Sequence, residues 1–220
     1  MKQDYTHITF VIDRSGSMST MQAEAQSAFN AFIDDQRKLP GKLTVTLVQF
    51  DTEYEVVWNA KNVSKKMKPY KLEPRGCTAL YDAVGKAINA TGEYLEGLSE
   101  ANRPEKVLFG VLTDGAENAS HEFSAASIKE MITHQTEKYS WEFNFLAANQ
   151  DAITSASDIG IAHSNAMGYA GTGKGVAAAF ACYSTGAINY RGGAVRGIVL
   201  DDVAPDEDSQ SVCKNNSVKN

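Results

Sequence analysis

The sequence predicts an α/β fold: a doubly wound, mostly parallel central sheet with one antiparallel edge strand and helices on both faces. Two observations support this prediction. Continuous apolar runs, such as 106–114, alternate along the chain with segments whose apolar residues recur every three or four positions. Strands that are buried on both faces and that alternate with amphipathic helices are typical of βαβ units. Neither an internal repeat nor a domain boundary interrupts the pattern, which favours a single domain.

The first half of the chain predicts a strand, a long helix, and a second strand with an antiparallel partner. The helix has apolar residues on one face, Ser19 or Thr20 to cap its start, and Pro40 just after its end. The partner segment alternates apolar and polar residues, as an edge hairpin does. In chain order, these segments are 7–13, 21–39, 42–51 and 53–60.

The second half continues the alternation with shorter segments. A loop over 72–78 leads into a helix whose apolar stripe begins at Leu80. A short segment at 151–161 connects the last two strands. The composition becomes polar and acidic over 191–220, which predicts a mobile tail after a folded domain at 1–190. The remaining elements are expected at 106–114 (strand), 124–139 (helix), 142–148 (strand), 164–170 (a weaker strand) and around 176–183 (the last helix).

Composition excludes several classes of function. The net charge of −6 argues against a surface for nucleic acid or for an anionic membrane, because such surfaces are basic. The sequence contains no apolar run long enough to cross a bilayer and no signal-peptide pattern at its start. Three widely spaced cysteines and four scattered histidines give neither a disulfide framework nor a zinc motif. These features predict a cytoplasmic protein.

Polar side chains gather where three of the expected segments meet their loops. Asp13, Ser15 and Ser17 follow the first strand, Asp114 ends the strand at 106–114, and Thr78 precedes a helix. Ligands of doubly wound folds bind beyond the carboxyl ends of the strands, so these side chains are expected to converge. All five offer hard oxygen ligands. Such a set suits Mg²⁺, with Mn²⁺ or Ca²⁺ also possible, rather than zinc or copper.

In residue type, order and approximate spacing, these five positions resemble the metal-ion-dependent adhesion site (MIDAS) of von Willebrand factor type A (VWA) domains. The resemblance covers about residues 5–190. One departure is Cys77, where many members of the family have a second glycine. The chain is most similar to the stand-alone bacterial or phage versions of the domain, since it has neither the disulfides nor the long extensions of adhesion receptors.

The resemblance implies a role for each position. Ser15 and Ser17 bind the metal directly, Thr78 does so in the ligand-competent state, and Asp13 and Asp114 act largely through water. Two aspartates nearly neutralise a divalent ion while hydroxyls add no charge, so the metal stays electrophilic with one position open. The family uses that position to bind an Asp or Glu of a partner protein. By family analogy, the partner is an AAA-type ATPase or a stress-response protein.

Two other functions are considered. A metal-dependent phosphatase or hydrolase could use Asp13 as its nucleophile. Phosphatases of the haloacid dehalogenase type need a second aspartate two residues later, and Ser15 occupies that position. A structural assembly subunit could use the metal only to stabilise its loops. We expect a binding module rather than an enzyme.

Four neighbouring features have simpler interpretations. Residues 168–175 resemble a phosphate-binding loop but have Gly175 where the Mg²⁺-binding hydroxyl is needed, which favours a glycine-rich connection into the last helix. Arg14 is expected either in solvent or paired with an acidic partner. Glu117 and Asn118 are expected to line the rim of the site. Cys77 is expected to be a small packing residue.

Overall fold

The computed structural model describes residues 1–63 and 68–200, and only the backbone of 150–152. Within these residues, a six-stranded sheet has the strand order β3-β2-β1-β4-β5-β6. Only β3 runs antiparallel to its neighbour. The strands are β1 (Lys2–Asp13), β2 (Lys42–Phe50), β3 (Tyr54–Asn62), β4 (Pro104–Thr113), β5 (Glu142–Ala147) and β6 (Ala166–Gly168). The predicted fold class, including the antiparallel edge strand, is confirmed.

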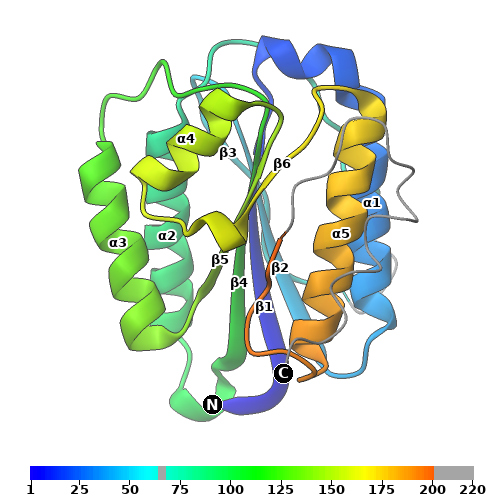
Figure 1. The fold of residues 1–220 in the computed structure, drawn as a ribbon. Coiled ribbons are helices and arrows are strands. Elements are labelled where there is room, and N and C mark those ends of the chain that lie inside the picture. The colour runs from blue at the N-terminus through cyan, green and yellow to red at the C-terminus, as the bar shows by residue number, and fades with distance from the viewer. Residues whose placement is uncertain (64–67, 201–220) are drawn as a thin grey trace.

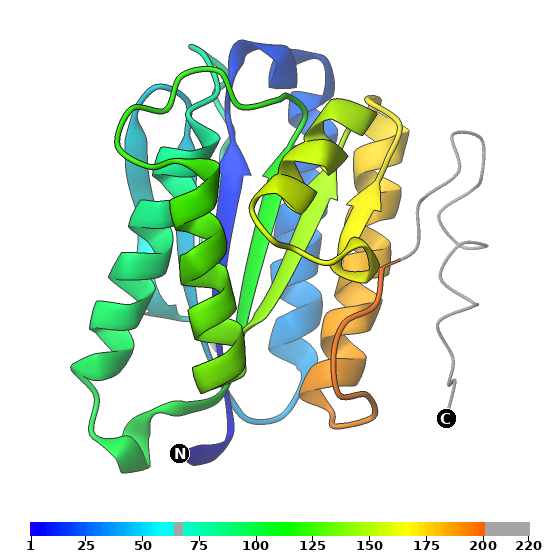
Figure 2. The same ribbon diagram turned by 60° about the vertical axis from the view of Figure 1, so that its left-hand side comes forward.

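Helices cover both faces of the sheet. Helices α1 and α5 pack on one face, and α2, α3 and α4 pack on the other (Figure 1; Figure 2 shows the same layers turned by 60°). The α-helices are α1 (Gln22–Lys38), α2 (Leu80–Glu96), α3 (Ala125–Tyr139), α4 (Gln150–Asp158) and α5 (Gly173–Arg191). Short 3-10 turns lie at Gly16–Met21, Glu100–Asn102 and His163–Asn165.

Strand β1 lies in the middle of the sheet and divides the core in two. Its side chains alternate between faces, so Phe10 packs against Phe29 of α1 and Phe180 of α5, while Val11 lies in the core under α2 and α3. Both side chains are fully buried. Burial on both faces explains why the last part of β1, residues 10–12, is continuously apolar.

Helix α1 begins later than the sequence suggested. The chain after β1 first forms the 3-10 turn Gly16–Met21, which buries Met18 and Met21, so Met21 and not Ser19 or Thr20 occupies the N-cap position. The hydroxyl of Thr20 donates to the carbonyl of Ser17 within that turn. The capping prediction was wrong because the chain is already helical when it reaches these residues.

The chain continues to pack beyond α5. Ile198 and Leu200 are buried in the core, although they lie in the range expected as a mobile tail. The N–H of Ile198 donates to Glu142 of β5, and the N–H of Leu200 donates to the carbonyl of Ser164. A Cβ on Gly186 of α5 would lie 2.7 Å from Ile198, so this glycine makes room for the contact. The rest of that range, 201–220, lies outside the described residues.

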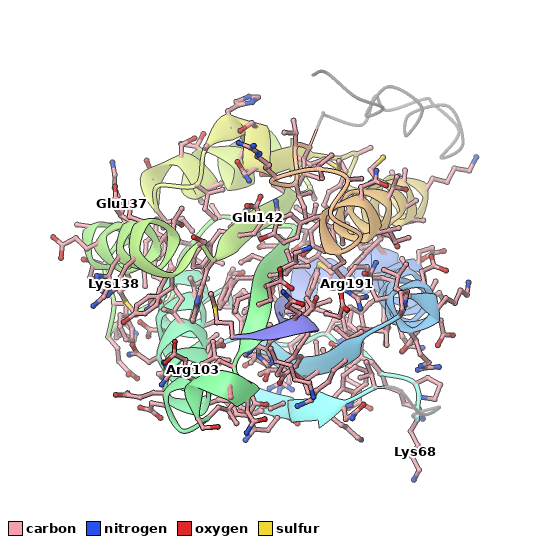
Figure 3. The ribbon with its side chains drawn as sticks, turned by 90° about the horizontal axis from the view of Figure 1, so that it is seen from below. Lys68, Arg103, Glu137, Lys138, Glu142 and Arg191 are labelled. Atoms are coloured by element: carbon pink, nitrogen blue, oxygen red, sulfur yellow. The ribbon has the colours of Figure 1, made fainter. Side chains whose placement is uncertain are left out.

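Glu142 and Arg191 mark the end of the molecule where the amino ends of the parallel strands lie (Figure 3). Arg191, the last residue of α5, donates to the backbone carbonyl of Gln36 at 2.7 Å and to its side chain at 3.0 Å. These bonds fasten the end of α5 to α1. The candidate site lies at the opposite edge of the sheet. Among the described helices, none has the length and apolar character needed to cross a membrane.

Candidate metal centre

The parallel register brings the ends of three strands to one edge of the sheet. Asp13 pairs with Phe50 at the end of β2, and Ile12 pairs with Leu112 near the end of β4. The loops that follow these strands are therefore neighbours, as Figure 1 shows at the upper edge of the sheet. This is the edge at which the sequence predicts the metal site.

Asp13 is fully buried, and both of its carboxylate oxygens accept hydrogen bonds. Oδ1 accepts from the backbone N–H of Ser15 at 2.6 Å, and Oδ2 accepts from the hydroxyl of Thr113 at 2.6 Å. The first bond closes the turn after β1, and the second ties β1 to β4. Burial raises the pKa of Asp13 to about 6 despite these hydrogen bonds.

The two serines connect this turn to the end of β4. The hydroxyl oxygens of Ser15 and Ser17 lie 3.0 Å apart, and the hydroxyl of Ser17 donates to Oδ1 of Asp114 at 2.8 Å. Asp114 is 9% exposed, and burial raises the pKa of its carboxyl. Four of the five predicted positions thus form one continuous cluster of oxygen atoms.

Thr78 lies beside this cluster and is held through its backbone. Its N–H donates to Oδ1 of Asn118 at 3.0 Å, and its carbonyl accepts from the N–H of Asn118 at 3.0 Å. Its hydroxyl oxygen lies 3.5 Å from the point where a Cβ on Gly115 would stand, so it faces the loop that carries Asp114. The side chain is 3% exposed. The structure therefore brings Thr78 to the edge that the other four residues share.

The loop after β4 also caps the helix that follows Thr78. The N–H of Tyr81 donates to Glu117 at 2.9 Å, and the N–H of Asp82 donates to the hydroxyl of Ser120 at 3.0 Å. The carboxylate of Asp82 in turn accepts three backbone N–H groups of the loop, which lower its pKa although burial alone would raise it. These exchanged bonds fix the loop that carries Asn118. Glu117 and Asn118 border the site as predicted, but they act on backbone groups.

Arg14 was assigned incorrectly from the sequence. Its side chain is neither solvent-exposed nor available to a partner protein, because the residue is only 4% exposed. Its guanidinium contacts Asp51 at 2.9 Å and Glu55 at 2.5 Å. Arg75 also binds Asp51, at 2.7 Å. Burial alone would raise the pKa of Asp51, but a backbone hydrogen bond from Glu53 and the charges of the two arginines lower it. These acidic residues follow β1 by about forty positions, so one sequence does not reveal the pairing.

The structure also shows where Cys77 and the glycine-rich segment at 168–175 lie. Cys77 is exposed and does not pack in the core, because the extended loop at 72–79 directs it outward. The glycine-rich segment at 168–175 leads into α5 as predicted, with the hydroxyl of Thr172 accepting from the N–H of Gly175 at the start of the helix.

The residues present fit a divalent cation. Asp13 and Asp114 place two buried carboxylates near each other, and within the described part of the chain neither forms a salt bridge. Buried charges of one sign need a compensating charge. The described residues contain no group of three or more His, Cys, Asp or Glu side chains that could hold a metal. Any metal at this edge would therefore depend on the hydroxyls of Ser15, Ser17 and Thr78.

Comparison with known proteins agrees with this fold. Residues 8–116, just under half of the chain, match the family model of the von Willebrand factor type A domain. The match includes all five predicted metal positions. No curated protein matches the chain in sequence.

Solved structures extend the likeness in fold to most of the chain. The vWF domain of the type V pili tip protein Mfa5 from Porphyromonas gingivalis has a TM-score of 0.59 at 9% identity, covering 86% of this chain and 96% of that one. A von Willebrand factor type A protein from Catenulispora acidiphila has a TM-score of 0.56 at 16% identity, with 86% and 43% covered.

A third similar structure is proximal thread matrix protein 1 from the mussel byssus, described as having a zinc-occupied MIDAS motif. Its TM-score is 0.51 at 15% identity, and the match covers 76% of this chain and 41% of that one. The present chain spans less than half the length of the first structures that it matches. At these identities, the likeness concerns the fold alone.

Proposed function

We propose that this domain captures an acidic group of a partner protein through a divalent cation held at the edge formed by β1, β4 and the start of α2. The observation that carries the proposal is the cluster in which Ser17 contacts both Ser15 and Asp114 while Asp13 lies buried beside it. VWA domains are usually binding modules and not catalysts, which agrees with this reading. When bound, the metal supplies a Lewis-acidic position that a carboxylate can fill.

Two kinds of residue would hold such an ion. Ser15, Ser17 and Thr78 offer hydroxyl oxygens, while Asp13 and Asp114 supply negative charge. Asp13 has both oxygens engaged by Ser15 N–H and the Thr113 hydroxyl, which suits a residue that orients the turn. The same engagement and its full burial disfavour Asp13 as the nucleophile of a phosphatase.

We favour Mg²⁺, with Mn²⁺ and Ca²⁺ as alternatives, because every candidate ligand is a hard oxygen. Zinc also belongs in the test, since the mussel protein with a similar fold is described with zinc in this motif. We further propose that the protein works in the cytoplasm and that its domain is of the bacterial or phage type. An AAA-type ATPase or a stress-response protein is the partner class suggested by the family.

Binding of the metal is tested by calorimetry and thermal melting with each ion. A ligand that binds only the folded state raises stability by about 2.7 kcal/mol at 100 times its dissociation constant. Ser17→Ala and Thr78→Val should reduce this gain. Thr91→Val removes a buried hydroxyl far from the site and should keep the gain. Unchanged melting of the wild type with all four ions would refute the proposal.

Capture of a carboxylate is tested with Mn²⁺ bound to the protein. Water-proton relaxation reports the water molecules on the ion, and an acetylated tripeptide with a central Glu should displace one of them. The same tripeptide with Gln should not, because a neutral amide is a poorer ligand for a hard cation. If Mn²⁺ binds and both peptides leave the relaxation unchanged, the metal only stabilises the loops. Phosphate release that Asp13→Asn abolishes would favour the hydrolase alternative.

A further inference from the structure

Three chain segments meet at one buried carboxylate beside the candidate metal centre. Asp51, which follows β2, is 1% exposed. Its Oδ2 accepts from Nε of Arg14 at 2.9 Å and from Nε of Arg75 at 2.7 Å. Arg14 stands between two of the proposed metal positions, and Arg75 belongs to the loop that carries Thr78. One oxygen atom thus joins the turn after β1 to the loop before α2.

Backbone hydrogen bonds join the same segments. The N–H of Arg75 donates to the carbonyl of Arg14 at 2.7 Å, and the N–H of Gly16 donates to the carbonyl of Gly76 at 3.1 Å. The N–H of Ala79 donates to the carbonyl of Asp51 at 3.0 Å. Ala79 is the residue next to Thr78, so Asp51 fixes both ends of the short path from Arg75 to Thr78.

The carboxylate is itself held by its surroundings. Its Oδ1 accepts from the N–H of Glu53 at 2.6 Å, and the backbone N–H of Asp51 donates to the carbonyl of Glu53 at 3.1 Å. Glu55 completes the arrangement by binding the other side of the Arg14 guanidinium and the side-chain amide of Gln49. A Cβ on Gly76 would lie 3.2 Å from Cβ of Asp51, and its φ of +70° suits glycine. The loop is therefore packed closely against Asp51.

We propose that Asp51, acting through Arg14 and Arg75, is the positioning residue that sets the distance between the two hydroxyls of the first turn and the hydroxyl of Thr78. This inference rests on the proposed function, since it concerns the same metal centre. Asp51 does not contact the proposed ligands' hydroxyls; it orients the backbone that carries them. Residues that orient metal ligands in this way typically change metal affinity about 10–100-fold when they are replaced.

The test is a Mn²⁺ titration followed by calorimetry and by water-proton relaxation of the bound ion. Asp51→Asn should weaken the affinity of the protein for Mn²⁺ about 10–100-fold. Arg75→Gln removes a half-exposed ion-pair partner of Asp51. It should lower the Mn²⁺ affinity less than Asp51→Asn does and leave the melting temperature nearly unchanged. In both variants, the relaxation per bound ion should rise, because water replaces a hydroxyl that is no longer in position. Arg75→Lys should restore part of the affinity by keeping the charge.

Lys38→Gln is the matched control, because it removes an exposed ion pair with Asp35 at the far end of α1. It should bind Mn²⁺ as the wild type does. If Asp51→Asn does not fold, Arg75→Gln alone decides the question. Wild-type affinity and relaxation in a folded Arg75→Gln, and in Asp51→Asn where it folds, would overturn this inference alone. Failure of the wild type to bind Mn²⁺ would overturn this inference, and failure to bind Mg²⁺, Mn²⁺, Ca²⁺ and Zn²⁺ alike would overturn the proposed function as well.

Discussion

Asn118 and Thr78 exchange two hydrogen bonds, one in each direction: Thr78 N–H donates to the Asn118 side chain, and Asn118 N–H donates to the Thr78 carbonyl. Thr78 is nearly completely buried, whereas Asn118 is exposed. A residue of the loop after β4 therefore fixes the backbone of a residue that precedes α2, and the Thr78 hydroxyl is positioned by a side chain outside the proposed ligand set.

Removing that side chain should weaken metal binding more than it weakens the fold. Asn118→Ala deprives the Thr78 N–H of its acceptor, and a lost hydrogen bond of this kind costs about 1 kcal/mol of stability. We expect a smaller rise in melting temperature on adding Mg²⁺ than in the wild type. Asn102→Ala, which removes an exposed amide bonded to Ser99, should keep the full rise. Equal rises in the two variants would show that Asn118 does not position Thr78.

Replacing Arg14 should lower the free energy of unfolding far more than replacing Arg75, which binds the same carboxylate of Asp51. Arg14→Met leaves Glu55 and part of the buried Asp51 uncompensated, and breaking a buried pair costs about 3–5 kcal/mol. The Arg75 side chain is 54% exposed, so Arg75→Met should cost only about 0–1 kcal/mol. Urea unfolding of the two variants measures both values. Similar losses would mean that the burial of Arg14 has no energetic consequence.

His7 should make the fold sensitive to acid. Its side chain is fully buried between the hydroxyls of Thr44 and Thr9, and burial, with a smaller effect of the Lys42 charge, lowers its pKa to about 3. The unfolded chain titrates near 6.5, so the neutral imidazole stabilises the fold fully above that pH. This contribution is lost as the pH falls from about 6.5 toward 3, at about 1.4 kcal/mol per pH unit.

The comparison of wild type with His7→Gln isolates this group, because all other titrating groups are shared. Unfolding free energies measured from pH 7 to pH 4 should show the wild type losing stability faster than the variant as the pH falls. Parallel curves would mean that His7 keeps an ordinary pKa in the folded protein.

The segment after α5 should contribute to the core. Ile198 is 1% exposed and packs against Gly186, so Ile198→Ala should cost about 2–5 kcal/mol through lost burial and the cavity left behind. Val199, the next residue, is 56% exposed, and Val199→Ala should change stability by less than about 0.5 kcal/mol. Thermal or urea unfolding distinguishes the two, and an equally small effect of both would place Ile198 outside the core.

The sheet could be predicted because buried parallel strands have continuous apolar sequences and the helices between them are strongly periodic. Helix α4 was expected only as a connecting segment, since its nine residues are too few for a clear period. Ile198 and Leu200 were missed because two isolated apolar residues in a polar stretch give no pattern. The first helical turn was misplaced because Gly16–Met21 forms a 3-10 turn before α1.

The clustering of the candidate residues could be predicted from the sequence, but the hydrogen bonds and ion pairs that hold their backbone could not. Asp13, Ser15, Ser17 and Asp114 could be grouped because they follow strands whose ends must lie at one edge. The hydrogen bonds that fix Thr78 come from Asn118, 40 residues further along the chain. Asp51 was not identified at all, since its role depends on two arginines brought together only by folding.

The capping of α2 by the loop after β4 has a consequence for the order of events during synthesis. Tyr81 N–H finds its acceptor on Glu117, 36 residues later, and Asp82 N–H finds its acceptor on Ser120. While α2 is leaving the ribosome, its first turn still lacks both partners. We therefore expect the turn carrying Ser15 and Ser17 to form early against β2, and Thr78 to join it only after β4 has entered the sheet. If the proposed cation binds at this edge, a nascent chain stalled before residue 113 should be unable to retain it, even where the core residues already synthesised have packed together.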